Sequence, residues 1–209
     1  MADPQSFSTS GGSPGPGGMS GSKVGTRDQL LAGRRQRSLS EVGQASEAIA
    51  AHLLASDQVR RAATVAAYVS MGTEPGTGLL LEALLERGTR VILPVLRPDN
   101  DLDWAVHTGT LVPARRGLLE PAGPDLGADA IATADLVLVP GLAVSPTGAR
   151  LGRGGGSYDR ALARVPVGTP VWILLYDDEV GLPVPVEPHD RPVTGAVTPS
   201  GIVRLRSTF

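Results

Sequence analysis

The chain has 209 residues, 41% of them hydrophobic and 19% charged, which is the size and balance of one folded domain. The net charge of −2 argues against a broad nucleic-acid surface, and the absence of cysteine excludes disulfides, cysteine zinc sites and thiol nucleophiles. Without a signal-peptide pattern or an apolar run of roughly 20 residues, the expectation is a cytoplasmic protein that binds neither nucleic acid nor membrane.

The N-terminal segment differs in composition from the rest of the chain. Its first 22 residues are nearly all Gly, Ser, Pro and Thr. Such a segment buries too little apolar surface to offset the entropy lost on ordering. Residues 1–22 are therefore predicted to be a disordered tail, and residues 23–209 a single domain.

Helices are predicted from apolar spacing and from capping residues. A basic helix begins the domain, and Ser38 with Glu41 forms a capping-box pattern at the start of the next one. Gly88 is expected to end the third helix, and a fourth follows a glycine run. The predicted helices cover residues 23–37, 38–55, 77–87 and 157–164.

Strands are predicted where short apolar runs alternate with these helices. They cover residues 64–70, 90–95, 102–106, 136–140, 171–176, 195–198 and 202–205. Continuous apolar strands between helices indicate a three-layer α/β/α fold whose mostly parallel sheet is covered on both faces. In such folds ligands bind at the carboxyl ends of the strands. The glycine run follows strand 136–140 and is expected near that edge.

The glycine run lies within the stretch PGLAVSPTGARLGRGGGSYDRALAR, residues 140–164. Consecutive glycines can turn backbone N–H groups toward an anion, and a helix that starts just afterwards adds a positive dipole end. Arg150 and Arg153 would donate to phosphate oxygens, and Asp159 would hold a magnesium ion. The GxxxxGK(S/T) phosphate loop is absent. A mobile surface loop, with Asp159 as a helix cap, explains the same residues equally well.

This stretch resembles the signature of the 5-formyltetrahydrofolate cyclo-ligase family, also called 5,10-methenyltetrahydrofolate synthetases. That signature reads PGLAFD, a short turn, and then G-x-RLGRGGGYYDR. Residues 140–143, 148, 150–156 and 158–160 match it, and other landmarks follow in family order from residue 23 to about 198. The resemblance implies an enzyme that uses ATP and Mg²⁺ to convert 5-formyltetrahydrofolate to 5,10-methenyltetrahydrofolate, releasing ADP and phosphate.

The resemblance implies an ATP site on the first helix and the glycine loop. Lys23 and Arg27 are four residues apart, which places them on one helix face, although a solvated basic helix would look the same. Arg153 and Tyr158 are the implied catalytic residues. The full set of implied ATP-binding residues is Lys23, Arg27, Arg150, Gly152, Arg153, Gly154, Gly155, Gly156, Ser157 and Tyr158. Arg34 and Arg35 also fall where the family keeps basic residues, with no role assigned.

The folate site implied by the resemblance is built from other segments. Glu74 is implied to bind the pterin, because a carboxylate can accept two hydrogen bonds from an aminopyrimidine edge. Trp104 would wall the pterin pocket, or would belong to the core. Glu120 would lie near the cleft, or would only form a turn. Ser157 and Tyr158 complete the implied substrate-binding set.

The implied magnesium ligands are Asp159 and Asp190. They are 31 residues apart and converge only if both loops lie at the same edge of the sheet. The histidines at 52, 107 and 189 have no zinc-site spacing. His52 is expected on the second helix and His107 at the surface.

Two positions depart from the family pattern and leave alternatives open. Family members commonly have aspartate where this chain has Ser145, and an aromatic residue where it has Ser157. The alternatives are a divergent ATP-dependent enzyme for another formylated or pterin-like molecule, and a non-catalytic folate-binding protein. ATP and 5-formyltetrahydrofolate are the expected small-molecule partners, and the sequence is compatible with a monomer.

Overall fold

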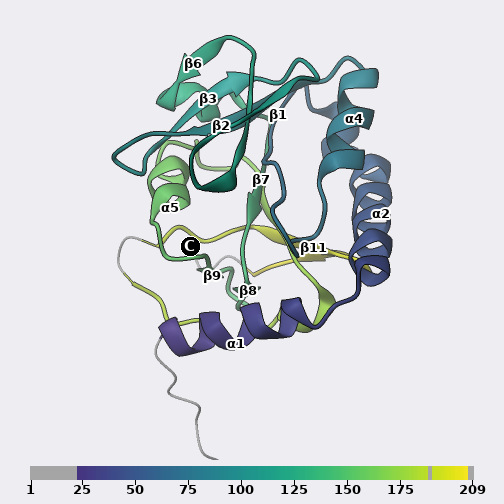
Figure 1. The fold of residues 1–209 in the computed structure, drawn as a ribbon, viewed down its shortest axis with the longest axis vertical. Helices are drawn as coiled ribbons and strands as arrows, with labels where there is room; N and C mark the ends of the chain where they lie inside the picture. The colour runs from purple at the N-terminus through teal and green to yellow at the C-terminus, as the bar shows by residue number, and fades with distance from the viewer. Residues whose placement is uncertain (1–22, 188–189, 207–209) are drawn as a thin grey trace, which may run out of the picture.

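The computed structural model describes residues 23–187 and 190–206, so the tail predicted at 1–22 lies outside the described residues. Eight strands form one sheet in the order β12-β11-β10-β7-β1-β2-β3-β6 (Figure 1). They are β1 (Thr64–Ala66), β2 (Arg90–Leu96), β3 (Leu102–Val106), β6 (Asp125–Gly127), β7 (Leu136–Pro140), β10 (Val171–Leu174), β11 (Gly195–Thr198) and β12 (Gly201–Arg204).

The central strands of this sheet are parallel. β1 pairs in parallel with β2 and β7, and β10 does so with β7 and β11. β12, β3 and β6 add to the two sides in antiparallel register. β2 and β7 therefore lie on opposite sides of β1. The strand order reverses between β1 and β7, and this topological switch point lies at their carboxyl ends.

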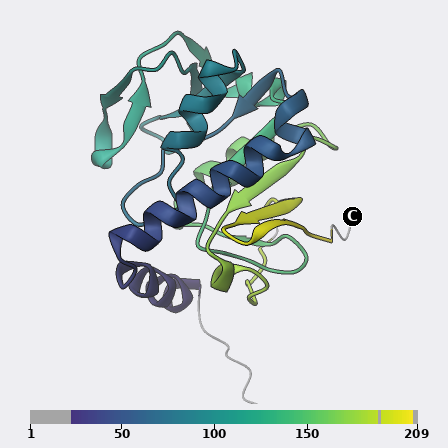
Figure 2. The same ribbon diagram turned by 90° about the vertical axis from the view of Figure 1, so that its right-hand side faces the viewer.

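Helices cover both faces of the sheet. α2 and α4 pack on one face, which Figure 2 shows from outside, and α5 lies on the other (Figure 1). The helices are α1 (Lys23–Arg35), α2 (Leu39–Ala55), α3 (Asp57–Arg61), α4 (Gly78–Glu86) and α5 (Ser157–Leu162), with 3-10 turns η1 (Arg115–Gly117), η2 (Ala128–Thr133) and η3 (Asp177–Glu179). The predicted three-layer fold with a mostly parallel sheet is confirmed.

The sequence signals for helix ends at Ser38 and Gly88 agree with the structure. The Ser38 hydroxyl accepts the Glu41 N–H at 3.2 Å, and the Glu41 carboxylate accepts the Ser38 N–H at 2.7 Å, so the predicted capping box is formed. Gly88 follows α4 with a φ of 74°, a left-handed conformation that glycine adopts without strain.

The structure differs from the sequence predictions in several short segments. The strand predicted over 64–70 ends at Ala66. Ala67 still donates to the Ile92 carbonyl at 3.0 Å, but beyond it the chain bonds to the residue before α4: the Thr77 hydroxyl accepts the Ser70 N–H at 3.0 Å and donates to the Tyr68 carbonyl at 2.8 Å. The prediction missed α3 and β6. It also missed two small hairpins, β4 (Leu111–Pro113) with β5 (Leu119–Pro121) and β8 (Ala143–Val144) with β9 (Arg150–Leu151).

The core of the described residues has a large apolar cluster on each face of the sheet and a third, small one beside α1, formed by Leu142, Ala143 and Leu151. Ile49 and Leu84 belong to the cluster under α2 and α4, and Leu162 belongs to the one under α5. His107 was expected at the surface, and this was wrong: it is 6% exposed, and its backbone N–H donates to Val91 O at 2.9 Å, which extends the pairing of β3 with β2 by one residue. Among the described residues, no helix combines the length and the apolar character needed to cross a bilayer.

A buried ion pair anchors α1 to the rest of the fold. The Arg34 guanidinium donates from Nε and Nη2 to the two carboxylate oxygens of Glu179, each at 2.7 Å, and also to the Gly141 carbonyl at 2.7 Å. Both charged side chains are almost fully buried, with exposures of 1% and 2%. Gly141 directly follows β7, so this contact holds α1 across the carboxyl edge of the sheet.

We predict that Arg34→Ala lowers the free energy of unfolding by about 3–5 kcal/mol, because it leaves the Glu179 carboxylate buried without its cation. Arg35→Ala is the matched control, since Arg35 is the next residue on α1 and its side chain is exposed. It should change stability by no more than about 0.5 kcal/mol. Urea unfolding followed by circular dichroism measures both, and equal effects would contradict the anchoring role.

Candidate active site

A deep cavity lies at the switch point of the sheet. Its volume is about 740 Å³, which is in the range of small-molecule sites. Tyr68 follows β1, Leu96 ends β2 and Gly141 follows β7, and all three line the cavity. The predicted site residues that also line it are Lys23, Arg27, Glu74, Glu120, Arg150, Gly152, Arg153, Gly154, Gly155, Gly156, Ser157, Tyr158, Asp159 and Asp190.

The glycine run forms one wall of this cavity, between the β8–β9 hairpin and α5. Gly154 and Gly156 have φ values of 98° and 68°, which strain any residue with a Cβ atom. At Gly152 a Cβ atom would lie 2.6 Å from Nη1 of Arg150. The loop therefore needs glycine at these positions for its shape and for close packing against Arg150.

Ser145, one of the two departures from the family pattern, lies in the β8–β9 turn. Its hydroxyl accepts the Ala149 N–H at 3.0 Å and the Thr147 N–H at 3.3 Å. It is 6% exposed and is not among the residues that line the cavity. A short polar side chain here closes the turn, which is also what an aspartate would do.

α1 brings two cations to the cavity, as its spacing predicted. The Arg27 Nε donates to the Gly152 carbonyl at 2.9 Å, so this side chain packs directly on the glycine loop. The Lys23 ammonium lies 3.0 Å from the Asp190 carboxylate and 3.2 Å from that of Glu187. Residues near the two ends of the chain thus meet at one side of the cavity.

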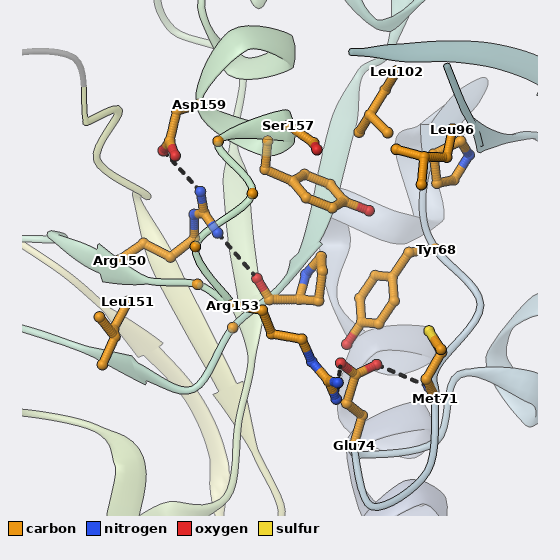
Figure 3. Close-up of a pocket in the computed structure, with 18 of the residues that line it drawn as sticks. Tyr68, Met71, Glu74, Leu96, Leu102, Arg150, Leu151, Arg153, Ser157 and Asp159 are labelled. Atoms are coloured by element: carbon orange, nitrogen blue, oxygen red, sulfur yellow. Dashed lines mark hydrogen bonds and ion pairs between the residues drawn. The ribbon is translucent and has the colours of Figure 1, made fainter. Parts of the chain in front are cut away.

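Arg150 is buried beneath the loop and pairs with the first turn of α5. Its Nη2 donates to Asp159 Oδ1 at 2.8 Å (Figure 3), and its guanidinium carbon lies 5.8 Å from the centre of the Tyr158 ring. Its Nε is buried with no hydrogen-bond partner among the described residues. The predicted ATP cation and the predicted magnesium ligand are therefore in contact with each other.

Arg153 and Glu74 form a similar pair on the other side of the cavity. Arg153 Nη2 lies 3.0 Å from Glu74 Oε1, and Figure 3 shows the guanidinium directed at that carboxylate. The second oxygen of Glu74 accepts the Met71 N–H at 2.8 Å, which fixes the carboxylate in its own turn. The Arg153 side chain is 50% exposed and that of Glu74 only 8%, so the arginine is the partner that can move.

Charges of opposite sign balance across the cavity lining. Among the described lining residues five are cationic, namely Lys23, Arg27, Arg116, Arg150 and Arg153, and five are acidic, namely Glu74, Glu120, Asp159, Glu187 and Asp190. Three of the predicted ATP-side cations each contact a carboxylate predicted to bind magnesium or folate. An anionic ligand must therefore replace carboxylates as partners of these cations.

Two tyrosine hydroxyls lie at the cavity, and the sequence analysis identified only one of them. Burial and the nearby charge of Glu74 raise the pKa of Tyr158, with Arg150 opposing the shift. Burial followed by Glu74 also raises the pKa of Tyr68, well above its ordinary value. Both phenols are thus hydrogen-bond donors at neutral pH. Tyr68 was missed because an aromatic residue at the end of an apolar strand reads as core.

Trp104 and Glu120, the other two residues of the implied folate site, lie in different environments. Trp104 is 0% exposed, packs in the core beneath α5 and is not among the cavity-lining residues, which agrees with the alternative of a core residue. Glu120 lines the cavity, and its carboxylate accepts the Leu96 N–H at 2.9 Å. It therefore ties β5 to the end of β2 at the cavity wall.

Asp159 and Asp190 both border the cavity, although no group of three His, Asp or Glu side chains suited to a metal occurs in the described part of the chain. A magnesium ion commonly takes one or two carboxylates and fills its remaining positions with water and phosphate oxygens. Two carboxylates beside a phosphate-type loop fit that chemistry. The contacts of Arg150 and Lys23 with these carboxylates would have to give way.

Comparison with known proteins identifies relatives across the folded part. The model of the 5-formyltetrahydrofolate cyclo-ligase family matches residues 19–199. The chain is 45% identical over 192 residues to a 5-formyltetrahydrofolate cyclo-ligase of Mycolicibacterium smegmatis, covering 88% of this chain and 98% of the relative. It is 34% identical to the Escherichia coli protein of the same name, covering 78% and 90%.

Solved structures of proteins named 5,10-methenyltetrahydrofolate synthetase share the fold of this chain. A 5,10-methenyltetrahydrofolate synthetase of Aquifex aeolicus superposes with a TM-score of 0.77 at 27% identity, covering 90% of this chain and 94% of that one. A synthetase from Mycoplasma pneumoniae, at 19% identity and a TM-score of 0.69, shares the fold.

Proposed function

The chain belongs to the 5-formyltetrahydrofolate cyclo-ligase family, and from this membership we propose that it converts 5-formyltetrahydrofolate to 5,10-methenyltetrahydrofolate in the cavity at the sheet switch point. ATP would be the second substrate and would leave as ADP and phosphate. The proposal assigns the glycine-loop side of the cavity to ATP and the opposite side to the folate.

The observation that carries this proposal is that one cavity combines two unlike halves. One half has the glycine loop with Lys23, Arg27 and Arg153, which suits phosphate oxygens. The other half is apolar and includes Leu96 and Leu102, a surface that suits a pterin ring. A reaction that transfers a phosphoryl group to a folate needs both halves next to each other.

The first chemical step makes the formyl oxygen a leaving group. That oxygen is amide-like, so direct attack by N10 on the formyl carbon would stall. In the proposed step the formyl oxygen attacks the γ-phosphorus of ATP, a new P–O bond forms, and the bond to the ADP oxygen breaks. The N5 lone pair moves toward the formyl carbon, which gives an iminium phosphate.

The second step closes the ring. N10 attacks the formyl carbon and loses its proton, and the C–O bond to phosphate breaks, giving inorganic phosphate and the methenyl product. The enzyme's part in such a transfer is positioning and charge neutralisation. Arg153 would neutralise charge on the transferred phosphoryl group, and the protonated Tyr158 hydroxyl would donate to the reacting groups. No covalent nucleophile is required, which suits a chain without cysteine.

Ligand binding would exchange the partners of the ion pairs in the cavity. Phosphate oxygens would take Arg153 away from Glu74, and the freed carboxylate could then accept N–H groups of the pterin. Glu74 is buried, so losing Arg153 would leave its carboxylate without a partner, which costs free energy. A bound folate would offset this cost by donating its N–H groups to the carboxylate. ATP and folate would therefore favour each other's binding, and by linkage the coupling is reciprocal.

Magnesium enters the proposal through the same exchange. Asp159 and Asp190 are the residues that would hold it, and the bound ion would neutralise charge on the ATP phosphates. Asp159 would then release Arg150, and Asp190 would release Lys23, for contacts with phosphate. The metal and the nucleotide would thus each free partners for the other.

The decisive experiment incubates the protein with 5-formyltetrahydrofolate, ATP and magnesium, and follows the near-ultraviolet absorbance of the methenyl product. We expect product only when ATP is present. A folded protein that binds the folate without turnover would favour the storage alternative. Binding of ATP alone would favour a divergent enzyme, for which Ser157 at the cavity wall is the motivating departure.

We predict that Arg153→Ala lowers kcat/KM at least ~100-fold, because it removes charge stabilisation from the transferred phosphoryl group. Arg90→Ala is the control, since this exposed arginine begins β2 at the opposite edge of the sheet. It should retain near-normal turnover in the same absorbance assay. A normal rate for the Arg153 variant would refute the assigned role.

We predict that Asp159→Asn raises the magnesium concentration for half-maximal rate by about tenfold or more, because an amide is a much weaker ligand than a carboxylate. Asp28→Asn removes an exposed carboxylate from α1, outside the cavity lining, and should leave the requirement unchanged. Initial rates across a magnesium titration measure both. An unchanged requirement in the Asp159 variant would remove this residue from the metal site.

A further inference from the structure

The Tyr68 hydroxyl is an unusual buried polar group of this fold. The side chain is 3% exposed and lines the cavity, yet its hydroxyl has no hydrogen-bond partner among the described residues. A buried hydroxyl without a partner costs free energy and is rare in folded proteins. A ligand in the cavity would supply the missing partner.

The position of this hydroxyl is fixed from two sides. The ring packs in the apolar cluster under α2 and α4, and the backbone carbonyl of Tyr68 accepts the Thr77 hydroxyl at 2.8 Å. Figure 3 shows the phenol pointing toward the carboxylate of Glu74, where Arg153 also arrives. The raised pKa of Tyr68 keeps the phenol protonated, so the group is available as a donor.

We propose that the Tyr68 hydroxyl donates a hydrogen bond to the 4-oxo oxygen of the pterin ring, beside the N–H groups that Glu74 accepts. This inference rests on the proposed function and adds a specificity-determining contact to it. The 2-amino and N3–H donors of a pterin lie next to the 4-oxo acceptor on one edge of the ring. Glu74 supplies acceptors and Tyr68 a neighbouring donor, so the pair matches that edge.

Tyr68→Phe tests the contact, because it removes only the hydroxyl and keeps the ring in the core. We expect the KM for 5-formyltetrahydrofolate, and its Kd measured calorimetrically without ATP, to rise about 5- to 20-fold, the effect of one lost hydrogen bond. The KM for ATP should stay within about twofold of wild type. Unfolding should show no loss of stability, since no bond within the protein is broken.

Tyr176→Phe is the contrasting variant for stability. The Tyr176 hydroxyl donates to the Thr73 carbonyl at 3.0 Å, so its loss should lower the midpoint of thermal unfolding. If Tyr68→Phe instead lowers the midpoint as much and leaves the folate KM and Kd unchanged, the proposal is overturned. A wild-type protein with no ATP-dependent product would refute the proposed function, whereas turnover with equal folate KM in wild type and Tyr68→Phe would refute only this contact.

A second, independent observation concerns Arg116, in the turn between β4 and β5. Its φ is 57°, a left-handed conformation that is uncommon for a residue other than glycine. It is exposed, lines the cavity and has no ion pair or side-chain hydrogen bond with the described residues. The neighbouring Leu118 and Leu119 also line the cavity, so this part of the lining combines an exposed cation with apolar side chains.

The structure assigns Arg116 to a carboxylate at the outer end of the substrate. A folate extends from the pterin through an aminobenzoyl ring to a glutamate with two carboxylates. Leucine side chains beside an exposed arginine offer the ring a surface and the glutamate a charge-assisted donor. This subsite also rests on the proposed function, but it depends on the glutamate rather than on the pterin.

Arg116→Asn tests this subsite, because asparagine tolerates the left-handed conformation and carries no charge. Its KM for 5-formyltetrahydrofolate should rise about threefold to tenfold, the range for an exposed ion pair or one charged hydrogen bond. Its KM for 5-formyltetrahydropteroate, which lacks the glutamate, should equal that of wild type. Arg115→Asn changes the adjacent arginine, which does not line the cavity, and should behave as wild type with both substrates.

The outcomes distinguish a failure of the Arg116 subsite from a failure of the proposed function. Equal KM values of Arg116→Asn and Arg115→Asn for the glutamate substrate would overturn the subsite. A similar loss with the pteroate would also overturn it, since the effect would then be independent of the carboxylates. A wild-type protein inactive with both substrates would refute the proposed function itself.

Discussion

The buried pair between Arg34 and Glu179 is the interaction on which the cavity depends. α1 packs Leu30 and Leu31 on a small apolar cluster, but its buried residue is Arg34. The guanidinium joins this helix to η3 and to the Gly141 carbonyl at the end of β7. The Arg37 side chain lies over the Tyr176 ring at 3.9 Å and adds a second contact to the same region. Arg27 reaches the glycine loop, and Lys23 the carboxylates of Glu187 and Asp190, because the helix that carries them is held at that edge.

Internal pairing of charges then explains how so polar a cavity exists in a folded protein. Buried cations and carboxylates are costly when alone; the Arg150–Asp159 and Arg153–Glu74 pairs each contain one buried partner, and both partners of Lys23–Asp190 are partly buried. The same pairing makes the cavity a poor site for a single anion. A phosphate that takes a cation away from its carboxylate leaves that carboxylate without a partner. When ATP, the second substrate and a magnesium ion bind together, each cation and each carboxylate of the cavity has a partner. The electrostatics therefore favour a reaction that joins ATP and a second substrate over storage of either one.

The sequence predicted those parts of the fold that local chemistry determines. The capping box at Ser38, the stop at Gly88 and the apolar runs of the central strands each depend on a few neighbouring residues. The cavity lies at the sheet edge where the sequence predicted a ligand site, because parallel strands have a common carboxyl end. Contacts between distant residues were not predictable: Arg34 and Glu179 are 145 residues apart, and strands of two or three residues such as β8 have no periodicity to detect. Tyr68 escaped notice because only the structure shows that its hydroxyl lacks a partner.

Of the two serines that depart from the family pattern, Ser157 bears on ligand binding and Ser145 does not. Ser145 closes a turn away from the cavity, so its replacement of an acidic residue bears on the hairpin and not on the ligand. Ser157 lines the cavity next to Tyr158, so a smaller side chain there enlarges the space beside a retained phenol. A wider pocket weakens apolar contact with a ring, whereas the proposed contacts of the Tyr68 hydroxyl and the Glu74 carboxylate would act on polar atoms at the ring's edge. Recognition in this chain would thus shift from stacking toward hydrogen bonding, which keeps selectivity for a pterin while tolerating the loss of one aromatic wall.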